Sequence, residues 1–323
     1  MKRIQLSNVS FEGDNNVYLL DDDVPTLIDT GDWTPETREK LASSLAEWGL
    51  AFADIERVFL THWHGDHVGL ADEIQEAGGA TVYVHELDAP LVRGDRDAWD
   101  ALSALHEQRF EEWGIPEDGR ETLRAFFGTG HAGEATIEVT PIQDGESFSV
   151  GGSTLKAVHA PGHAAGLCLY EFGDEVFSGD ALLPKYTPNV GGADVRVDRA
   201  LEKYLRTLEA IETAGYDRAW PGHRDVISDP ASRAREIITH HEERSYRVLD
   251  ALSRLGPTDA WTVSADLFGE LESIHILHGP GESYAHLEHL REAGAVHRDG
   301  HNYSLADGVA DELATLETER WPL

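Results

Sequence analysis

The chain has 323 residues, and its 60 acidic residues outnumber 26 Lys and Arg, so the formal net charge is −34. With 41% apolar residues it has material for a buried core, which excludes disorder, collagen and coiled coil as whole-chain descriptions. No stretch approaches the roughly 18 uninterrupted apolar residues of a membrane helix. The N-terminus lacks the apolar core of a secretory signal, and the single cysteine, Cys168, excludes an intrachain disulfide. These features predict a cytoplasmic protein with no membrane partner.

The acidic residues are spread along the chain, and only five of the basic residues are Lys. A distributed negative shell suits molar salt, in which the Debye length falls to roughly 3 Å and self-repulsion is screened. We therefore interpret the chain as halophilic, with an acidic mesophilic enzyme as the alternative. The same charge argues against a broad nucleic-acid-binding face, because phosphate contacts need clustered Lys or Arg. That objection weakens in molar salt, which also screens repulsion from a polyanion.

In chain order, short apolar runs predict strands with helices between them, which is typical of stacked sheets covered by helices. Thr34 is placed to cap a helix that begins at Pro35. Residues 86–128 predict two or three amphipathic helices inserted between strands, and further helices are predicted at 198–214 and 230–255. The predicted strands are 3–9, 16–20, 26–29, 56–61, 80–85, 135–142, 147–150, 154–160, 167–172 and 175–180.

The last part of the chain has a different pattern. Gly256-Pro257 ends a predicted helix, and TVSADLFGEL and SYAHLEHLREAG predict two more. The turn Asp299-Gly300 predicts a β-hairpin. Three helices and a hairpin are typical of a winged helix. We therefore predict a large α/β domain at 1–235, with a helical insertion at about 86–130, and a winged-helix domain at 236–323.

The strongest chemical signal is Thr61-His62-Trp63-His64-Gly65-Asp66-His67, which directly follows a predicted strand. Its three imidazoles and one carboxylate follow neither helical nor strand periodicity. These are the ligand types that zinc and neighbouring divalent metals take. An exposed loop that is merely rich in His is the alternative, and four ligand-type side chains this close together disfavour it.

Three more ligand-type side chains share one format: a strand end, then a small residue, then the side chain. They are His163 in APGH, Asp180 in FSGD and His223 in WPGH. A glycine beside each of them lets the backbone approach a metal closely. Each is weak evidence alone, but seven candidates together can make two coordination shells that share one carboxylate.

These residues resemble the signature of the metallo-β-lactamase superfamily, H-x-H-x-D-H, which stands at 62–67 and continues through the three later sites. The resemblance implies an α/β fold of the αββα sandwich type, with the metals at one edge. The motif order with an appended winged helix is similar to the β-lactamase-like protein 2 group, whose characterised members include a single-strand-specific endoribonuclease. The resemblance further implies that His62, His64 and His163 hold a first metal, that Asp66, His67 and His223 hold a second, and that Asp180 bridges both.

Such a centre implies hydrolysis. Two divalent metals about 3.5–4 Å apart hold a bridging hydroxide that attacks a carbonyl or phosphoryl centre. Asp66 is the predicted catalytic residue, because it can orient that hydroxide as well as ligate. Zinc is the default metal for an imidazole-rich site, and manganese or iron also fit. The predicted substrate contacts are Lys185, Tyr186, Asn189 and Arg224.

Three functions stay open. The leading hypothesis is a metal-dependent nuclease that cleaves phosphodiesters in single-stranded RNA. The second is a thioester or lactone hydrolase of the glyoxalase II type, a group that shares all seven ligands and acts on small molecules. The third is a nucleic-acid- or protein-binding module with a relic metal site, which the complete ligand set disfavours. The winged helix is interpreted as a packing or dimerisation element, which would make a homodimer.

Two further groups of residues are interpreted as lying outside the metal-ligand set. Asp29-Thr30-Gly31 ends a strand near the expected metal edge, and in the family such a turn supports the site rather than ligating. His286 and His289 are three apart on a predicted helix, a spacing that can bind a metal. Without a third ligand nearby, they are interpreted as ordinary surface.

Overall fold

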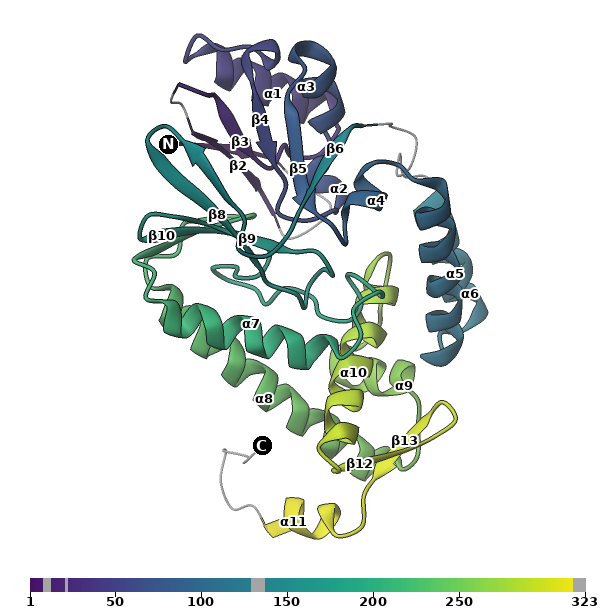
Figure 1. Cartoon of the computed structure of the whole chain (residues 1–323). Coiled ribbons are helices and arrows are strands. Elements are labelled where there is room, and N and C mark those ends of the chain that lie inside the picture. The colour runs from purple at the N-terminus through teal and green to yellow at the C-terminus, as the bar shows by residue number, and fades with distance from the viewer. Residues whose placement is uncertain (8–12, 21–22, 129–136, 316–323) are drawn as a thin grey trace. The chain divides into compact units, whose positions relative to one another are not determined.

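The computed structural model describes residues 1–7, 13–20, 23–128 and 137–315 (Figure 1). The ends of several predicted elements, at 8–9, 129–130, 135–136 and 316–323, lie outside the described residues. The chain forms two compact units. Unit 1 comprises Met1–Asp100, His131–Pro188 and Thr207–Ala234, and unit 2 comprises Ala101–Gly130, Asn189–Arg206 and Arg235–Leu323.

The first sheet of unit 1 has six strands in the order β1-β2-β3-β4-β5-β6. Strands β1 to β3 pair antiparallel and β3 to β6 pair parallel, so helices return the chain between the later strands. All six coincide with predicted strands. Their bounds are β1 (Lys2–Leu6), β2 (Asn15–Leu20), β3 (Thr26–Ile28), β4 (Arg57–Phe59), β5 (Thr81–His85) and β6 (Val139–Ile142).

The second sheet has five strands in the order β11-β10-β9-β8-β7. Four of them were predicted. The fifth, β11, was missed because its four residues, RAWP, are too short to show a period of two. It pairs parallel to β10, and the other neighbours pair antiparallel. The bounds are β7 (Ser147–Val150), β8 (Ser153–His159), β9 (Cys168–Phe172), β10 (Glu175–Gly179) and β11 (Arg218–Pro221).

The two sheets of unit 1 pack face to face through aromatic side chains. The Phe59 ring stacks on Tyr83 with centroids 4.6 Å apart, and it meets Tyr170 of the second sheet edge-on at 5.5 Å. Such pairs contribute about 0.5–1.5 kcal/mol each beyond the burial of their area. Cys168 belongs to this core, as a small buried hydrophobe. The aromatic layer fixes the spacing between the two sheets, and it therefore also fixes how far apart the strand ends of the two sheets lie at their shared edge.

Helices cover the outer face of the first sheet (Figure 1). Helix α1 (Pro35–Ala46) begins as predicted, because the Thr34 side chain accepts a hydrogen bond from Thr37 N. Leu41 of α1 and Ile74 of α3 (Ala71–Gly78) are fully buried against the sheet. Burying one such side chain contributes roughly 1.5–3 kcal/mol. Unit 1 is thus an α/β arrangement with stacked sheets, as the sequence predicted.

The segment predicted as a helical insertion contains α4 (Ala89–Val92), α5 (Arg96–Glu112) and α6 (Glu117–Gly128). Helix α4 belongs to unit 1 and α6 to unit 2, and α5 passes from unit 1 into unit 2. Unit 1 also contains the 3-10 turn η1 (Phe52–Asp54) and α2 (Gly65–Val68). Helix α7 (Ala200–Ala214) passes from unit 2 into unit 1, and α8 (Pro230–Leu255) passes from unit 1 into unit 2.

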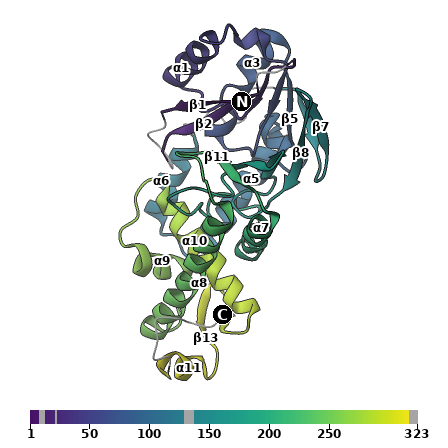
Figure 2. The same ribbon diagram turned by 90° about the vertical axis from the view of Figure 1, so that its left-hand side faces the viewer.

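The rest of unit 2 is mostly helical. Helices α9 and α10 lie side by side, and a short antiparallel hairpin follows α10 (Figure 2). No helix among the residues that the structure describes is long and apolar enough to cross a membrane. The bounds are α9 (Ala260–Phe268), α10 (His275–Glu292), β12 (Val296–Asp299), β13 (Asn302–Leu305) and α11 (Val309–Thr315).

Candidate metal centre

The seven predicted ligands gather at one edge of unit 1. Each follows the carboxyl end of a strand: the 62–67 segment follows β4, His163 follows β8, Asp180 follows β10 and His223 follows β11. Strands β8, β10 and β11 run in the same direction, so their carboxyl ends meet at one edge of the second sheet. The sequence places each ligand at a strand end, and the sheet brings those ends together.

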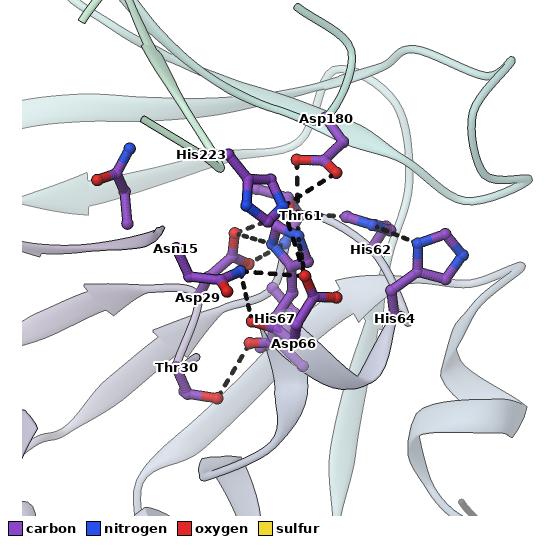
Figure 3. Close-up of polar contacts among 12 residues, drawn as sticks. Asn15, Asp29, Thr30, Thr61, His62, His64, Asp66, His67, Asp180 and His223 are labelled. Carbon is purple, nitrogen blue, oxygen red and sulfur yellow. Dashed lines mark hydrogen bonds and ion pairs between the residues drawn. The ribbon is translucent and has the colours of Figure 1, made fainter. Parts of the chain in front are cut away.

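The first three of these ligands are in direct contact. His64 Nδ1 lies 2.9 Å from His62 Nε2 (Figure 3). It also lies 3.1 Å from His163 Nε2. Two nitrogens bound to one zinc at 2.0–2.1 Å and at a tetrahedral angle lie about 3.3 Å apart, so these separations are a few tenths of an ångström shorter than those of a zinc-bound pair. The donor atoms of the first set, His62, His64 and His163, all lie within 4.8 Å of one another. The same is true of the donor atoms of the second set, Asp66, His67 and His223.

Asp180 lies between the two sets. Its carboxylate is 3.7 Å from His163 Nε2, 3.6 Å from His67 Nε2 and 3.4 Å from His223 Nε2. It therefore faces one nitrogen of the first set and two of the second. This is the position that a carboxylate shared by two metals would take.

Several atoms at the centre are buried without a hydrogen bond to any residue that the structure describes. They are His67 Nε2, His223 Nε2 and Asp180 Oδ1, whose side chains are almost inaccessible to solvent. A buried polar atom without a partner costs about 1–3 kcal/mol, so such atoms are rare unless something else satisfies them. The donor set of imidazoles and carboxylates fits divalent cations, which would satisfy these atoms together.

The outer nitrogens of three ligands are held by other groups. His67 Nδ1 lies 2.9 Å from Asp29 Oδ2, and His223 Nδ1 lies 2.9 Å from the Gly13 carbonyl oxygen. His62 Nδ1 lies 3.0 Å from Thr61 Oγ1. These contacts fix each ring and leave Nε2 directed at the centre, as in metal sites where an outer partner orients a ligating His.

Asp29 is the most heavily used of these outer partners. It has a left-handed backbone, with φ of 59°, and its carboxylate accepts hydrogen bonds from Thr61 N at 2.7 Å and Thr61 Oγ1 at 2.9 Å. With the His67 contact, it joins the ends of β3 and β4. The supporting role expected for the 29–31 turn agrees with this geometry.

We expect Asp29→Asn to lower metal affinity and turnover by about 10- to 100-fold, because an amide cannot accept all the bonds that the carboxylate accepts. The measurement is competition of the protein with a chromophoric chelator for Zn²⁺, together with steady-state kinetics. Asp97→Asn, the same change at an exposed position on α5, serves as the control. Equal affinities in the Asp29 and Asp97 variants would contradict this role.

Sequence reasoning missed two further supporting residues. Asp88 is fully buried, and its two carboxylate oxygens accept from Trp63 N at 3.2 Å and Gly166 N at 3.1 Å, tying the His62–His64 segment to the loop of His163. Asn15 Nδ2 donates to the Asp66 carbonyl at 2.9 Å and to Asp66 Oδ2 at 3.2 Å. Neither lies in a motif, and both act through contacts between residues at least 25 positions apart.

Charges at the centre shift the pKa values of its groups. Burial alone lowers the pKa of His223, but Asp180 and Asp66 more than offset it and raise it to about 9. His67 is shifted in the same way, with its pKa well above the usual value because of Asp66, Asp180 and Asp29. Burial lowers the pKa of His62 well below its usual value. In protein without metal, protonated His67 and His223 would therefore neutralise the buried carboxylates.

We expect Zn²⁺ binding to metal-stripped protein at pH 7 to release protons, because imidazole must be neutral to ligate and the pKa values of His67 and His223 are raised by the neighbouring carboxylates. Apparent affinity should fall as pH decreases, since protons compete with the metal. Titration calorimetry in two buffers of different ionisation enthalpy measures the number of protons released. Zinc binding without proton release would contradict the protonation states assigned to the centre.

The predicted substrate contacts fall in both units. Tyr186 is 45% exposed, with the Arg224 guanidinium 4.7 Å and the Lys185 ammonium 5.3 Å from its ring centroid. Asn189 belongs to unit 2, where its amide donates to the His278 carbonyl and to Glu282. Three of the four thus cluster after β10 and β11, and the fourth is engaged within the helical unit.

The chain is similar in sequence and fold to known proteins. The profile of the Metallo-beta-lactamase superfamily matches residues 11–223. A metallo-beta-lactamase family protein from Thermus thermophilus superposes with a TM-score of 0.82 at 32% identity, over 94% of this chain and 98% of that one. A "Probable metallo-hydrolase" of Bacillus subtilis is 27% identical over 88% of this chain and 90% of its own length. A "Beta-lactamase-like protein 2 homolog" of Drosophila melanogaster is 27% identical over 75% of this chain and 69% of its own length.

Two stacked sheets with a cluster of imidazoles and carboxylates at one edge define a class of metal-dependent hydrolases, and this protein is one of them. The match to the superfamily begins at residue 11, before the supporting residue Asn15, and ends at His223, the last of the predicted ligands. The chain belongs to the metallo-β-lactamase superfamily.

Proposed function

We propose that this protein is a binuclear metal-dependent phosphodiesterase that cleaves single-stranded RNA. The observation that carries the proposal is the cationic group beside the centre, formed by Lys185 and Arg224 around the Tyr186 ring. The chain has a net charge of −34, and here two of its cations lie on one exposed aromatic ring. Phosphate contacts need such cations, and exposed aromatic rings stack on unpaired bases.

The position of Arg224 supports this assignment. It follows the ligand His223 directly, and its backbone is left-handed, with φ of 62°. Its guanidinium packs on Gly13, where an added Cβ would lie 2.8 Å from the guanidinium carbon. Gly13 is also the residue whose carbonyl holds the His223 ring. The cation is therefore tied to the same backbone that orients a ligand.

Bound divalent metals would supply an activated water and polarise the scissile phosphoryl group. In the proposed mechanism, His62, His64 and His163 would hold one metal, and Asp66, His67 and His223 would hold the other. Asp180 would offset the mutual repulsion of the two metals. Asp66 would also orient the attacking water by accepting a hydrogen bond from it, and Asn15 fixes the Asp66 carboxylate. Arg224 and Lys185 bind the phosphate groups and Tyr186 stacks on a base.

Side-by-side assays test the proposal. Protein purified in molar salt, which also tests the halophile interpretation, is assayed for metal per chain, for cleavage of single-stranded RNA and for hydrolysis of S-lactoylglutathione. For the wild type we expect two metals per chain, with zinc as the default, and cleavage of single-stranded RNA. We expect Arg224→Gln to slow RNA cleavage at least about tenfold and to leave the metal content unchanged. Arg218→Gln, an exposed Arg on β11, is the matched control.

Thioester or lactone hydrolysis of the glyoxalase II type is the second candidate, favoured by the same seven donor atoms. Turnover of the thioester alone, with no RNA cleavage, would establish it in place of the first. The binding-module hypothesis is not carried further, because the chain is a metal-dependent hydrolase by its family.

We propose that residues 236–323 form the winged helix, on the basis of α9, α10 and the β12–β13 hairpin. We further propose that it is a packing or homodimer element.

A further inference from the structure

A second group of ligand-type side chains lies inside unit 2. It consists of His241 on α8, and of Glu282 and His286 on α10. One nitrogen of each imidazole and one Glu282 carboxylate oxygen lie within 4.8 Å of one another. His241 is 1% exposed, His286 is 0% exposed and Glu282 is 7% exposed. None of them takes part in the centre of unit 1. The partner of His286 is therefore His241, not the helical neighbour His289 considered from the sequence.

The two rings are oriented by their contacts. His286 Nδ1 lies 2.8 Å from the Glu282 carbonyl oxygen. A carbonyl only accepts hydrogen bonds, so the proton of the neutral ring is assigned to Nδ1, and Nε2 carries a lone pair. That lone pair faces His241 Nδ1 at 3.3 Å. An inner nitrogen directed at a second ligand, with the outer nitrogen held by backbone, is the arrangement of a ligating His.

The separation of 3.3 Å suits a shared cation. Two imidazole nitrogens bound to one zinc at 2.0–2.1 Å and at a tetrahedral angle lie about 3.3 Å apart. A well-formed N–H hydrogen bond is shorter, at about 2.9–3.0 Å. His241 Nε2 is buried and makes no hydrogen bond among the described residues, so none of these neighbours fixes which nitrogen of His241 carries the proton.

The charge state of the group also suits a metal. Burial, with Arg244 nearby, holds the pKa of both His241 and His286 well below the usual value, so both rings are neutral at pH 7. Neutral imidazole is the form that ligates. Glu282 supplies the negative charge, and Arg244 and Asn189 hold its carboxylate. A carboxylate has about four lone-pair sites, so these contacts leave it able to bind a cation.

The backbone around Glu282 is built to bring these groups together. Gly281 of α10 packs on the loop of Gly192, where an added Cβ would lie 2.4 Å from the Gly192 Cα. This close approach places Asn189 beside Glu282, with Nδ2 3.1 Å from Oε2. The Gly191-Gly192 segment therefore serves the packing of unit 2.

We propose that His241, Glu282 and His286 form a further metal site, which binds Zn²⁺ or a similar divalent transition metal and ties α8 to α10. Two imidazoles and one carboxylate are a donor set that zinc takes in proteins. Because the group is buried, the site is structural, and the metal stabilises the packing of the helical unit rather than touching a substrate.

Zinc titration of the full chain tests this site. The experiment uses His62→Ala/His223→Ala protein, in which each ligand set of the centre of unit 1 has lost one imidazole. The protein is stripped of metal and titrated with Zn²⁺ against a chromophoric chelator. We expect one equivalent per chain to bind, and the midpoint of thermal unfolding to rise with Zn²⁺. Adding His286→Leu should abolish both effects, whereas adding His289→Gln, a change at the neighbouring His of α10, should leave both in place.

Glu282→Gln is the second variant, chosen because it preserves the shape of the side chain. It should weaken zinc binding in the same background at least about tenfold. Co²⁺ in place of Zn²⁺ should give the visible absorption of a tetrahedral site, lost with His286→Leu. Absence of zinc binding in the disabled background, or binding that neither His286→Leu nor Glu282→Gln weakens, would show a hydrogen-bonded His pair and overturn the proposal.

Discussion

Asp180→Ala is expected to abolish turnover while leaving the protein folded. Asp180 is the side chain that faces both ligand sets, at 3.4 to 3.7 Å from three imidazole nitrogens. Its removal takes away the carboxylate that faces both sets and leaves the Nε2 atoms of His67 and His223 without one of their two neighbouring carboxylates, the other being Asp66. Loss of several kcal/mol of transition-state stabilisation corresponds to at least about a thousandfold in rate. His62→Ala should have an effect of the same size, because it removes a ligand that contacts His64.

The fold should survive because neighbouring residues of β10 remain buried, including Val176 and Phe177 in the core of the second sheet. Steady-state rates and metal content measure the first effect, and circular dichroism with a thermal melt measures the second. Asp174→Ala, an exposed turn residue just before the same strand, is the matched control and should behave like the wild type. Wild-type rates in Asp180→Ala would refute the assigned centre.

Gly222→Ala is expected to damage the centre by adding a single methyl group. Its Cβ would lie 2.4 Å from Asp180 Oδ1 and 2.7 Å from His67 Cε1, closer than real Cβ contacts. The glycine cannot move away easily, because Gly222 N donates to the Gly179 carbonyl and its own carbonyl accepts from Asn16 N. The ligands must therefore shift. A displacement of about 1 Å can cost about 100-fold in rate, and overpacking costs about 1–3 kcal/mol of stability.

Gly65→Ala is the control for that substitution. Gly65 lies inside the ligand segment, as the first residue of α2, and an added Cβ there would meet no atom within 4 Å. Its φ is not left-handed, so Ala is tolerated by the backbone. Turnover and metal content should therefore stay close to wild type. If Gly65→Ala and Gly222→Ala were equally harmful, or equally harmless, the packing argument would be wrong.

The sequence by itself determined the ligand loops and most strands. Strand ends followed by His or Asp beside glycine were readable, because each signal lies within a few consecutive residues. Strand β11 was too short to show its period, but its ending, WPGH, still marked His223. The halophile interpretation and the winged-helix boundary at residue 236 stay predictions.

Only the tertiary structure decided which residues hold the ligands in place. The turn of Asp29 was expected to support the site, but its partners Thr61 and His67 are distant in sequence and were not predicted. Asp88 is a buried carboxylate whose partners are also distant in sequence, and no local pattern marks it. The same holds for Asn189, expected near the substrate and found against Glu282, and for His286, expected at the surface and found facing His241. A local sequence pattern indicates the backbone conformation of residues that are adjacent in the chain. The hydrogen-bond partner of a buried polar group depends instead on which strands and helices pack together.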